Sequence, residues 1–183
     1  GDNAFSNICF SESSVVNPTC PYSEAKKNCE DLIKLKSAEL TLDSTILRLP
    51  PVLGQADASN LGKLIRLAKS GAFIPTFSCG DTNSRSFISV INIKEVIRIL
   101  LEAQHPSKHN IYNLADDHHI SLNSLLRIYG DQRIIVLPAL VEKLIFKISF
   151  FQRILLKLYG SFVIENDKLK NDLGVKLCSS QQA

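Results

Sequence analysis

Apolar residues along the chain follow two spacings, one typical of helices and the other of short strands. Apolar positions three and four residues apart predict helical segments at residues 22–38, 60–70, 93–101, 138–159 and 165–173. Short runs rich in β-branched residues predict strands at residues 44–49, 87–90, 111–114 and 134–137. Because short strands that alternate with helices are typical of the α/β class, we expect an α/β fold.

Turn-forming residues mark the ends of these segments. Pro50-Pro51 stops the strand before it, because proline has no backbone N–H to donate. Ser121 is placed to cap a helix that begins at Leu122, and Gly174 closes the last helix. No G-x-G-x-x-G turn follows a strand, and the strands are too few for a complete doubly wound sheet. The pattern therefore predicts part of such a fold.

The stretch 137–159 carries a long apolar stripe, with its charged residues largely on other faces. The stripe consists of Leu140, Val141, Leu144, Ile145, Ile148, Phe151, Ile154, Leu155 and Leu158. The charged residues within the stretch and Pro138 argue against a membrane-spanning helix. Two interpretations remain: core or lid packing in a small domain, which we favour, and a basic amphipathic helix that rests on a membrane surface.

Composition and charge exclude several classes of protein. Hydrophobic residues make up 45% of the chain and charged residues 21%, as in ordinary globular domains. The net charge of +3 is mild and evenly spread, so we expect no nucleic-acid partner. The five cysteines form no C-x-x-C pair, which predicts neither a disulfide framework nor a zinc site. We expect free thiols in a reducing, cytoplasmic compartment, with Cys29 buried on the apolar face of its helix.

The histidines have two interpretations. His105 and His109 lie four residues apart, and His118-His119 follow, a spacing that could suggest a metal site. They flank Pro106 and a polar loop, and no thiolates lie at ligand spacing. We therefore favour a solvated loop and expect no metal.

One Y-x-x-x-K sequence occurs in the chain, from Tyr22 to Lys26. Side chains four residues apart on a helix share a face. A lysine ammonium beside a tyrosine stabilises the phenolate, so that the tyrosine can exchange a proton with a sugar hydroxyl or ketone while hydride moves to or from a nicotinamide. The spacing by itself is also what two surface side chains on a helix would show, so the surrounding sequence decides between the two.

The segments around and after this pair resemble the extended short-chain dehydrogenases. Residues 17–30 are similar to the segment around that family's catalytic helix, with a proline before the tyrosine and an acidic residue after the lysine. Further likenesses follow in the family's order: a strand and turn at 46–54, an R-x-F-x-x-V segment and helix at 83–97, a strand at 111–114, and a closing helix at 169–174. The closest likeness is to the nucleotide-sugar 4-epimerases and 4-keto reductases of the NAD-dependent epimerase/dehydratase family.

The resemblance implies a fold and a division into domains. The chain would be the C-terminal half of a Rossmann-type doubly wound fold, together with the small substrate-binding α/β domain. Residues 1–55 would be what remains of the dinucleotide-binding domain and would include the Y-x-x-x-K helix. Residues 56–183 would be mainly the substrate-binding domain, with some segments returning to the Rossmann sheet.

The resemblance also implies roles for residues around the cofactor. Tyr22 would be the general acid and base. Lys26 would be its electrostatic partner and would also bind the nicotinamide ribose. The backbone at Pro51 and Val52 would face the nicotinamide carboxamide.

Substrate-binding roles follow from the same likeness. Arg85 would reach the diphosphate of the sugar nucleotide, because a guanidinium donates to paired phosphates in a forked geometry. Its alternative is a surface arginine on a loop. Asn60 and Leu61 would lie in the substrate loop, although Asn60 is equally suited to cap a helix.

Some of the family's cofactor-binding and catalytic residues would lie upstream of Gly1. They are the Gly-rich phosphate turn and the serine or threonine that completes the catalytic triad. The sequence contains no methionine and begins with glycine, so we expect a processed, excised or incomplete chain. Without that turn, the pyrophosphate of the cofactor has no helix N-terminus to bind. We therefore expect weak cofactor binding by these residues alone.

The leading functional hypothesis is an NAD(P)-dependent epimerase that acts at C4 of a UDP-hexose derivative in surface polysaccharide biosynthesis. NAD or NADP would be its cofactor and a UDP-sugar its substrate. One alternative is a nucleotide-4-keto-sugar reductase of the same family, and another is a catalytically inactive fragment or partner-binding subunit. A homodimer formed through the Tyr22 helix follows by analogy with the wider family.

Overall fold

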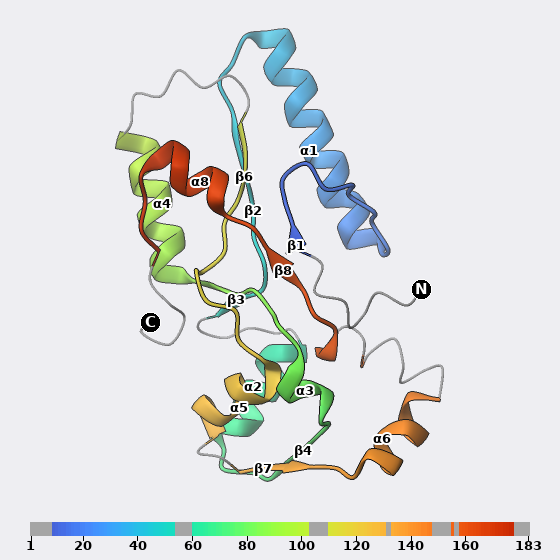
Figure 1. Cartoon of the computed structure of the whole chain (residues 1–183). Coiled ribbons are helices and arrows are strands. Elements are labelled where there is room, and N and C mark those ends of the chain that lie inside the picture. Colours follow the sequence, from blue (N-terminus) through green and yellow to red (C-terminus); the bar gives the residue numbers. More distant parts are fainter. Residues whose placement is uncertain are drawn as a thin grey trace. The chain divides into compact units, whose positions relative to one another are not determined.

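The structure is a computed structural model that describes residues 9–53, 60–102, 110–130, 133–147, 155 and 158–177. The chain forms two compact units, each built from segments that alternate along the sequence (Figure 1). Unit 1 consists of Gly1–Cys9, Leu53–Phe87 and His118–Val163. Unit 2 consists of Phe10–Val52, Ile88–Asp117 and Ile164–Ala183.

Unit 2 is organised around a parallel strand pair. β2 (Thr45–Arg48) lies beside β6 (Asn110–Asn113), and Arg48 is opposite Asn113. A parallel pair needs a crossover connection, and α4 (Val90–Glu102) lies within the connection between the two strands. α1 (Pro21–Leu40) precedes β2, and α8 (Asp167–Leu173) packs near β6.

The core of unit 2 is formed by apolar residues of β5 (Ile88–Ser89), α4, β6 and the residue after it, and of α8 and the segment that follows. Its buried members are Ile88, Val96, Tyr112, Leu114, Leu169, Val175 and Leu177. These residues come from three separate stretches of the chain, so that the unit's stability depends on non-local packing. Gly174 ends α8 in the left-handed conformation, at φ +63°.

α1 turns a polar face inward and an apolar face outward. Glu30 is only 14% exposed and is paired with Arg48, whereas Leu32 is 55% exposed and Cys29 is also exposed. The prediction that Cys29 is buried is therefore wrong. Glu30 faces inward instead, where its carboxylate pairs with the guanidinium of Arg48 at the end of β2.

Unit 1 also contains a parallel strand pair, formed by β4 (Ile74–Thr76) and β7 (Ile134–Val136). Its helices are α2 (Asn60–Lys69), α3 (Cys79–Thr82), α5 (Leu122–Gly130) and α6 (Ala139–Phe146). α2 packs on α5, and a Cβ added at Gly130 would lie 3.1 Å from the Cβ of Ala68. The largest core cluster of this unit consists of Ala68, Ile74, Phe77, Leu122, Leu126, Leu155 and Tyr159.

Two short strand pairs and two isolated bridges complete the strand pairing described. β1 (Cys9–Phe10) pairs with β8 (Val163–Ile164), and β3 (Val52–Leu53) pairs with β5 (Ile88–Ser89). Arg85 forms isolated bridges to Ile120 and Phe162.

The α/β class predicted from the sequence is confirmed, and α1, α2, α4 and α8 lie where their spacing placed them. The helical segment predicted over 138–159 is not one helix, because α6 ends at Phe146 and Lys147 is its C-cap. Ser121 caps α5, because its Oγ accepts a hydrogen bond from the backbone N–H of Ser124 at 3.1 Å. The segment 148–154 of the predicted apolar stripe lies outside the described residues. Among the helices of the described part, none is long and apolar enough to cross a membrane. The proposed domain division at residues 55 and 56 stays a prediction.

Candidate functional site

The start of α1 is fixed by local sequence. Pro21 opens the helix, where a missing N–H costs nothing. The Ser23 hydroxyl accepts hydrogen bonds from the backbone N–H groups of Thr19 at 3.0 Å and Cys20 at 3.1 Å. These bonds order the chain just before the helix, so Tyr22 is held in its first turn.

Tyr22 and Lys26 lie side by side on an exposed face of α1. The Lys26 Nζ is 5.7 Å from the centroid of the Tyr22 ring, and the Tyr22 side chain is 72% exposed. The structure therefore brings the two predicted catalytic side chains together and leaves the ring accessible. A phenol beside an ammonium is a pair that can move a proton to or from a bound hydroxyl.

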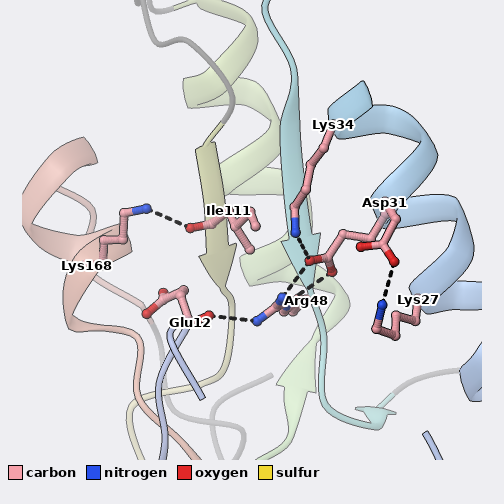
Figure 2. A network of polar contacts seen from close by, with 8 residues as sticks. Glu12, Lys27, Asp31, Lys34, Arg48, Ile111 and Lys168 are labelled. Carbon is pink, nitrogen blue, oxygen red and sulfur yellow. Dashed lines mark hydrogen bonds and ion pairs between the residues drawn. The ribbon is translucent and has the colours of Figure 1, made fainter. Parts of the chain in front are cut away.

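A polar network joins α1 to the end of β2 (Figure 2). The Arg48 guanidinium donates two hydrogen bonds to Glu30, one from Nη2 at 2.6 Å and one from Nε at 3.0 Å. Lys34 Nζ donates to the same carboxylate at 2.8 Å. A bidentate arginine–carboxylate pair restricts both partners in distance and orientation, so it fixes the helix relative to the strand.

The same arginine reaches the segment that precedes α1. Its Nη1 donates to the backbone carbonyl of Glu12 at 3.0 Å. The Glu12 carboxylate accepts a hydrogen bond from the backbone N–H of Asn113 at 2.9 Å, and Asn113 Nδ2 donates to the Phe10 carbonyl at 3.1 Å. The segment before the helix is thus tied to the ends of both β2 and β6.

The network shifts the pKa of Glu30. Hydrogen bonds from Arg48 and, to a smaller extent, from Lys34 lower the pKa of Glu30 to about 2, against the opposing effect of burial. Glu30 is therefore ionised at every pH at which the protein would function.

Pro51 and Val52 follow the network directly, three and four residues after Arg48. The Pro51 carbonyl accepts a hydrogen bond from Ile88 N–H at 3.2 Å, which holds this segment beside β5. Tyr22, Lys26, Pro51 and Val52 all belong to unit 2. An exposed phenol, an ammonium and an ordered backbone segment are groups of the kind that a nicotinamide nucleoside would need, so the residues present fit such a cofactor.

Arg85 lies in unit 1, half-buried between two other segments of that unit. Its Nη1 donates to the Gly160 carbonyl at 2.5 Å, and its backbone N–H donates to the Ile120 carbonyl at 3.2 Å. Burial lowers the pKa of Arg85 from its usual value, but a guanidinium stays charged at neutral pH. The hydrogen bond to Gly160 restrains this side chain, and its role at a diphosphate stays a prediction.

Asn60 and Leu61 begin α2, also in unit 1. Leu61 packs against the core residues of that unit. Their role in a substrate loop stays a prediction.

Sequence reasoning missed three residues that organise unit 2, namely Glu12, Arg48 and Asp116. Asp116 is buried, and its Oδ1 accepts hydrogen bonds from Ser89 N–H at 3.1 Å and Asn92 Nδ2 at 2.6 Å, at the start of α4. One signal could have revealed Arg48: a cation inside the apolar run Ile46–Leu49 needs a buried partner.

The histidines are placed only in part. His105 and His109 lie outside the described residues. His119 Nδ1 is 3.1 Å from the buried Ser86 hydroxyl, and burial lowers the pKa of this histidine. Across the described ranges, no group of three His, Cys, Asp or Glu side chains is arranged to hold a metal ion.

Comparison with known proteins then assigns a family. The model of the NAD dependent epimerase/dehydratase family matches residues 1–115, which is more than half of the 183 residues. The chain belongs to this family. The resemblance inferred from the Tyr22 segment and the segments after it is thereby confirmed. No curated protein is significantly similar in sequence.

Solved structures of epimerases and dehydratases share the fold. UDP-N-acetylglucosamine 4-epimerase from Bacillus cereus is 14% identical with a TM-score of 0.71, and the match covers 98% of this chain and 58% of that one. UDP-glucuronic acid 4-epimerase from Bacillus cereus, in complex with NAD, is 15% identical with a TM-score of 0.70, over 98% and 55%. DesIV, a dTDP-glucose 4,6-dehydratase from Streptomyces venezuelae, is 15% identical with a TM-score of 0.66, over 97% and 52%.

These likenesses confirm the Rossmann-type fold expected for this family member. The chain spans a little over half the length of each of these structures.

Proposed function

We propose that the chain carries the acid/base and substrate-binding part of a UDP-sugar 4-epimerase. The observation that supports this most directly is the Tyr22–Lys26 pair, exposed at the ordered start of α1 in a member of the epimerase/dehydratase family. Two of the structures described above are UDP-sugar 4-epimerases, which favours a UDP-sugar as substrate and C4 as the reacting carbon. A role in surface polysaccharide biosynthesis belongs to the same proposal.

The proposed chemistry needs one proton to leave the sugar and to return. The Tyr22 phenolate removes the proton of the C4 hydroxyl, and the Lys26 ammonium stabilises the charge on the phenolate before that transfer. A nicotinamide cofactor, when bound, would accept the hydride of C4 and would give it back to the opposite face of the C4 ketone. Tyr22 returns the proton to the ketone oxygen in that second step, which restores the alcohol with inverted configuration at C4. No net oxidant or reductant is consumed.

The cofactor in this proposal is NAD, because a UDP-glucuronic acid 4-epimerase and a dTDP-glucose 4,6-dehydratase of the same fold were solved with it. Pro51 and Val52 would meet the carboxamide through their backbone groups. The ion pair of Glu30 and Arg48 would hold the Tyr22 helix against the end of β2, and Pro51 follows Arg48 three residues later.

The sugar nucleotide would be held by residues of unit 1. Arg85 is a preorganised cation for its diphosphate, since the bond to Gly160 orients the guanidinium before any ligand arrives. Asn60 and Leu61 would contribute at the start of α2. In this proposal residues 1–55 serve the cofactor and residues 56–183 serve mainly the substrate.

Product analysis tests the proposal. The protein would be expressed from its natural reading frame, with any coding sequence that precedes residue 1, and incubated with UDP-N-acetylglucosamine, UDP-glucose or UDP-glucuronic acid. We expect at least one of them to be converted to its C4 epimer with catalytic NAD and no added reductant. Conversion that needs stoichiometric NADPH would instead show a 4-keto reductase, and unchanged substrate in every reaction would contradict the proposal.

A further inference from the structure

The orientation of α6 on unit 1 is set by one carboxylate and one apolar side chain. Glu142 accepts hydrogen bonds from the backbone N–H of Ser78 at 3.2 Å and from the Ser78 hydroxyl at 2.6 Å. Ile145 packs against the core cluster of unit 1, as does Leu137 just before the helix. Glu142 and Ile145 therefore define the inward face of α6.

The opposite face is both apolar and basic. Leu140, Lys143, Leu144 and Lys147 are spaced as i, i+3, i+4 and i+7, which places them on one side of a helix. Leu140 is 76% exposed and Leu144 is 65% exposed, and both lysines are also exposed. The predicted apolar stripe is therefore divided: Leu155 and Leu158 join the core, while Leu140 and Leu144 face outward.

We propose that this face of α6 docks on an anionic lipid surface. The leucines supply apolar area for the boundary between headgroups and acyl chains, and the lysines beside them supply charge for lipid phosphates. Charge complementarity favours this occupant, because the acidic residue of the helix, Glu142, points inward and is already bonded. The inference is independent of the proposed catalytic function.

The strand before α6 extends the apolar character of this part of the chain. Ile135 and Val136 of β7 are both exposed, and the next two residues lead directly into the helix. The helix is eight residues long, so it can lie in the plane of a surface and is too short to cross a bilayer.

Vesicle co-sedimentation of the full chain tests the proposal. We expect binding to vesicles of phosphatidylglycerol mixed with phosphatidylcholine, little binding to phosphatidylcholine alone, and loss of binding as salt is raised. Changing Lys143→Gln and Lys147→Gln together should weaken binding by roughly 30-fold. Changing Leu140→Gln and Leu144→Gln together should weaken it by at least about tenfold.

A matched control tests whether vesicle binding depends on this face of α6 or on any exposed leucine. Leu101, at the end of α4 in unit 2, is 81% exposed, so Leu101→Gln removes a similar exposed leucine and should leave binding unchanged. Far-UV circular dichroism checks that each variant folds. Absence of binding by the wild type, equal binding to both kinds of vesicle, or undiminished binding by either double variant would overturn the proposal. A dimer that forms without lipid and dissociates when Leu140→Gln and Leu144→Gln are combined would also overturn the proposal. A second copy of the chain would then be the partner of this face.

Discussion

Gly80 shows how tightly single residues are constrained in unit 1. A Cβ added at this position would lie 2.4 Å from Asn123 Oδ1 and 2.8 Å from Tyr159 Cε1. Neither neighbour can move easily, because Asn123 is fully buried with its Nδ2 bonded to the Phe77 carbonyl at 3.0 Å, and the Tyr159 ring is buried in the core.

We therefore expect Gly80→Ala to lower the free energy of unfolding by about 1–3 kcal/mol, the usual cost of overpacking a filled site. Urea denaturation followed by circular dichroism would measure it. Gly174→Asn is the control, because a Cβ at Gly174 meets nothing within 4 Å and asparagine tolerates its left-handed backbone. A Gly80→Ala variant as stable as the wild type would show that α3 is not packed as described.

Individual residues also show where sequence reasoning reached the site and where it stopped. Tyr22 and Lys26 could be found because their roles depend on local spacing along one helix. Arg48 and Glu12 could not be paired with their partners in advance, since their contacts join residues 18 and 101 positions apart in the sequence. Such contacts follow from the fold and not from a local pattern.

At the scale of elements, the ion pair between α1 and β2 makes a pH-dependent contribution to stability. Hydrogen bonding to Arg48 holds the pKa of Glu30 at about 2, below the ordinary value of 4.5. The stabilisation is therefore complete above pH 4.5 and is lost as the pH falls through about 2, where the native carboxylate takes up its proton.

We expect Glu30→Gln to lower stability by about 2 kcal/mol at neutral pH, and the difference from the wild type to shrink as the pH is lowered to about 3. Thermal unfolding of both proteins across this range measures it. Asp31→Asn is the matched control, because Asp31 pairs with Lys27 on the exposed side of the same helix and a surface pair contributes little. A stability difference that stays constant with pH would contradict the assigned role of Glu30.

Elements with several turns of regular spacing were predictable, whereas some of the shortest ones were not. α2, α4, α5 and α8 follow the spacing of their apolar residues, whereas β3 and α3 contain only two and four residues and show no period. The inward face of α1 was predicted wrongly, because the apolar positions were assumed to be buried. Instead Glu30 faces inward and pairs with the half-buried Arg48, and Leu32 and Cys29 face outward.

At the scale of the whole molecule, the outward apolar face of α1 is suited to a second copy of the chain. Leu32 and Leu35 are each 55% exposed on this helix. We propose that they contribute to a homodimer, and expect Leu32→Glu with Leu35→Glu to convert it to a monomer, as measured by sedimentation equilibrium. Leu101→Glu, on an exposed position of α4, should leave the dimer intact. A wild-type protein that is monomeric at all concentrations would refute the proposal.

The proposed function depends on the Tyr22–Lys26 pair, and one comparison tests that pair most directly. The protein is expressed from its natural reading frame and loaded with NAD, and a UDP-sugar is added. The rate at which reduced nicotinamide forms is then compared between the wild type and Tyr22→Phe. Tyr129 is a suitable control, because Lys69 Nζ lies 4.8 Å from its ring centroid in a similar tyrosine–lysine pair that has no proposed role.

We predict that Tyr22→Phe slows this reduction by about 100-fold or more while the protein still binds the UDP-sugar, and that Tyr129→Phe leaves the rate unchanged. Reduction by Tyr22→Phe at the wild-type rate would contradict the assignment of Tyr22 as the acid and base.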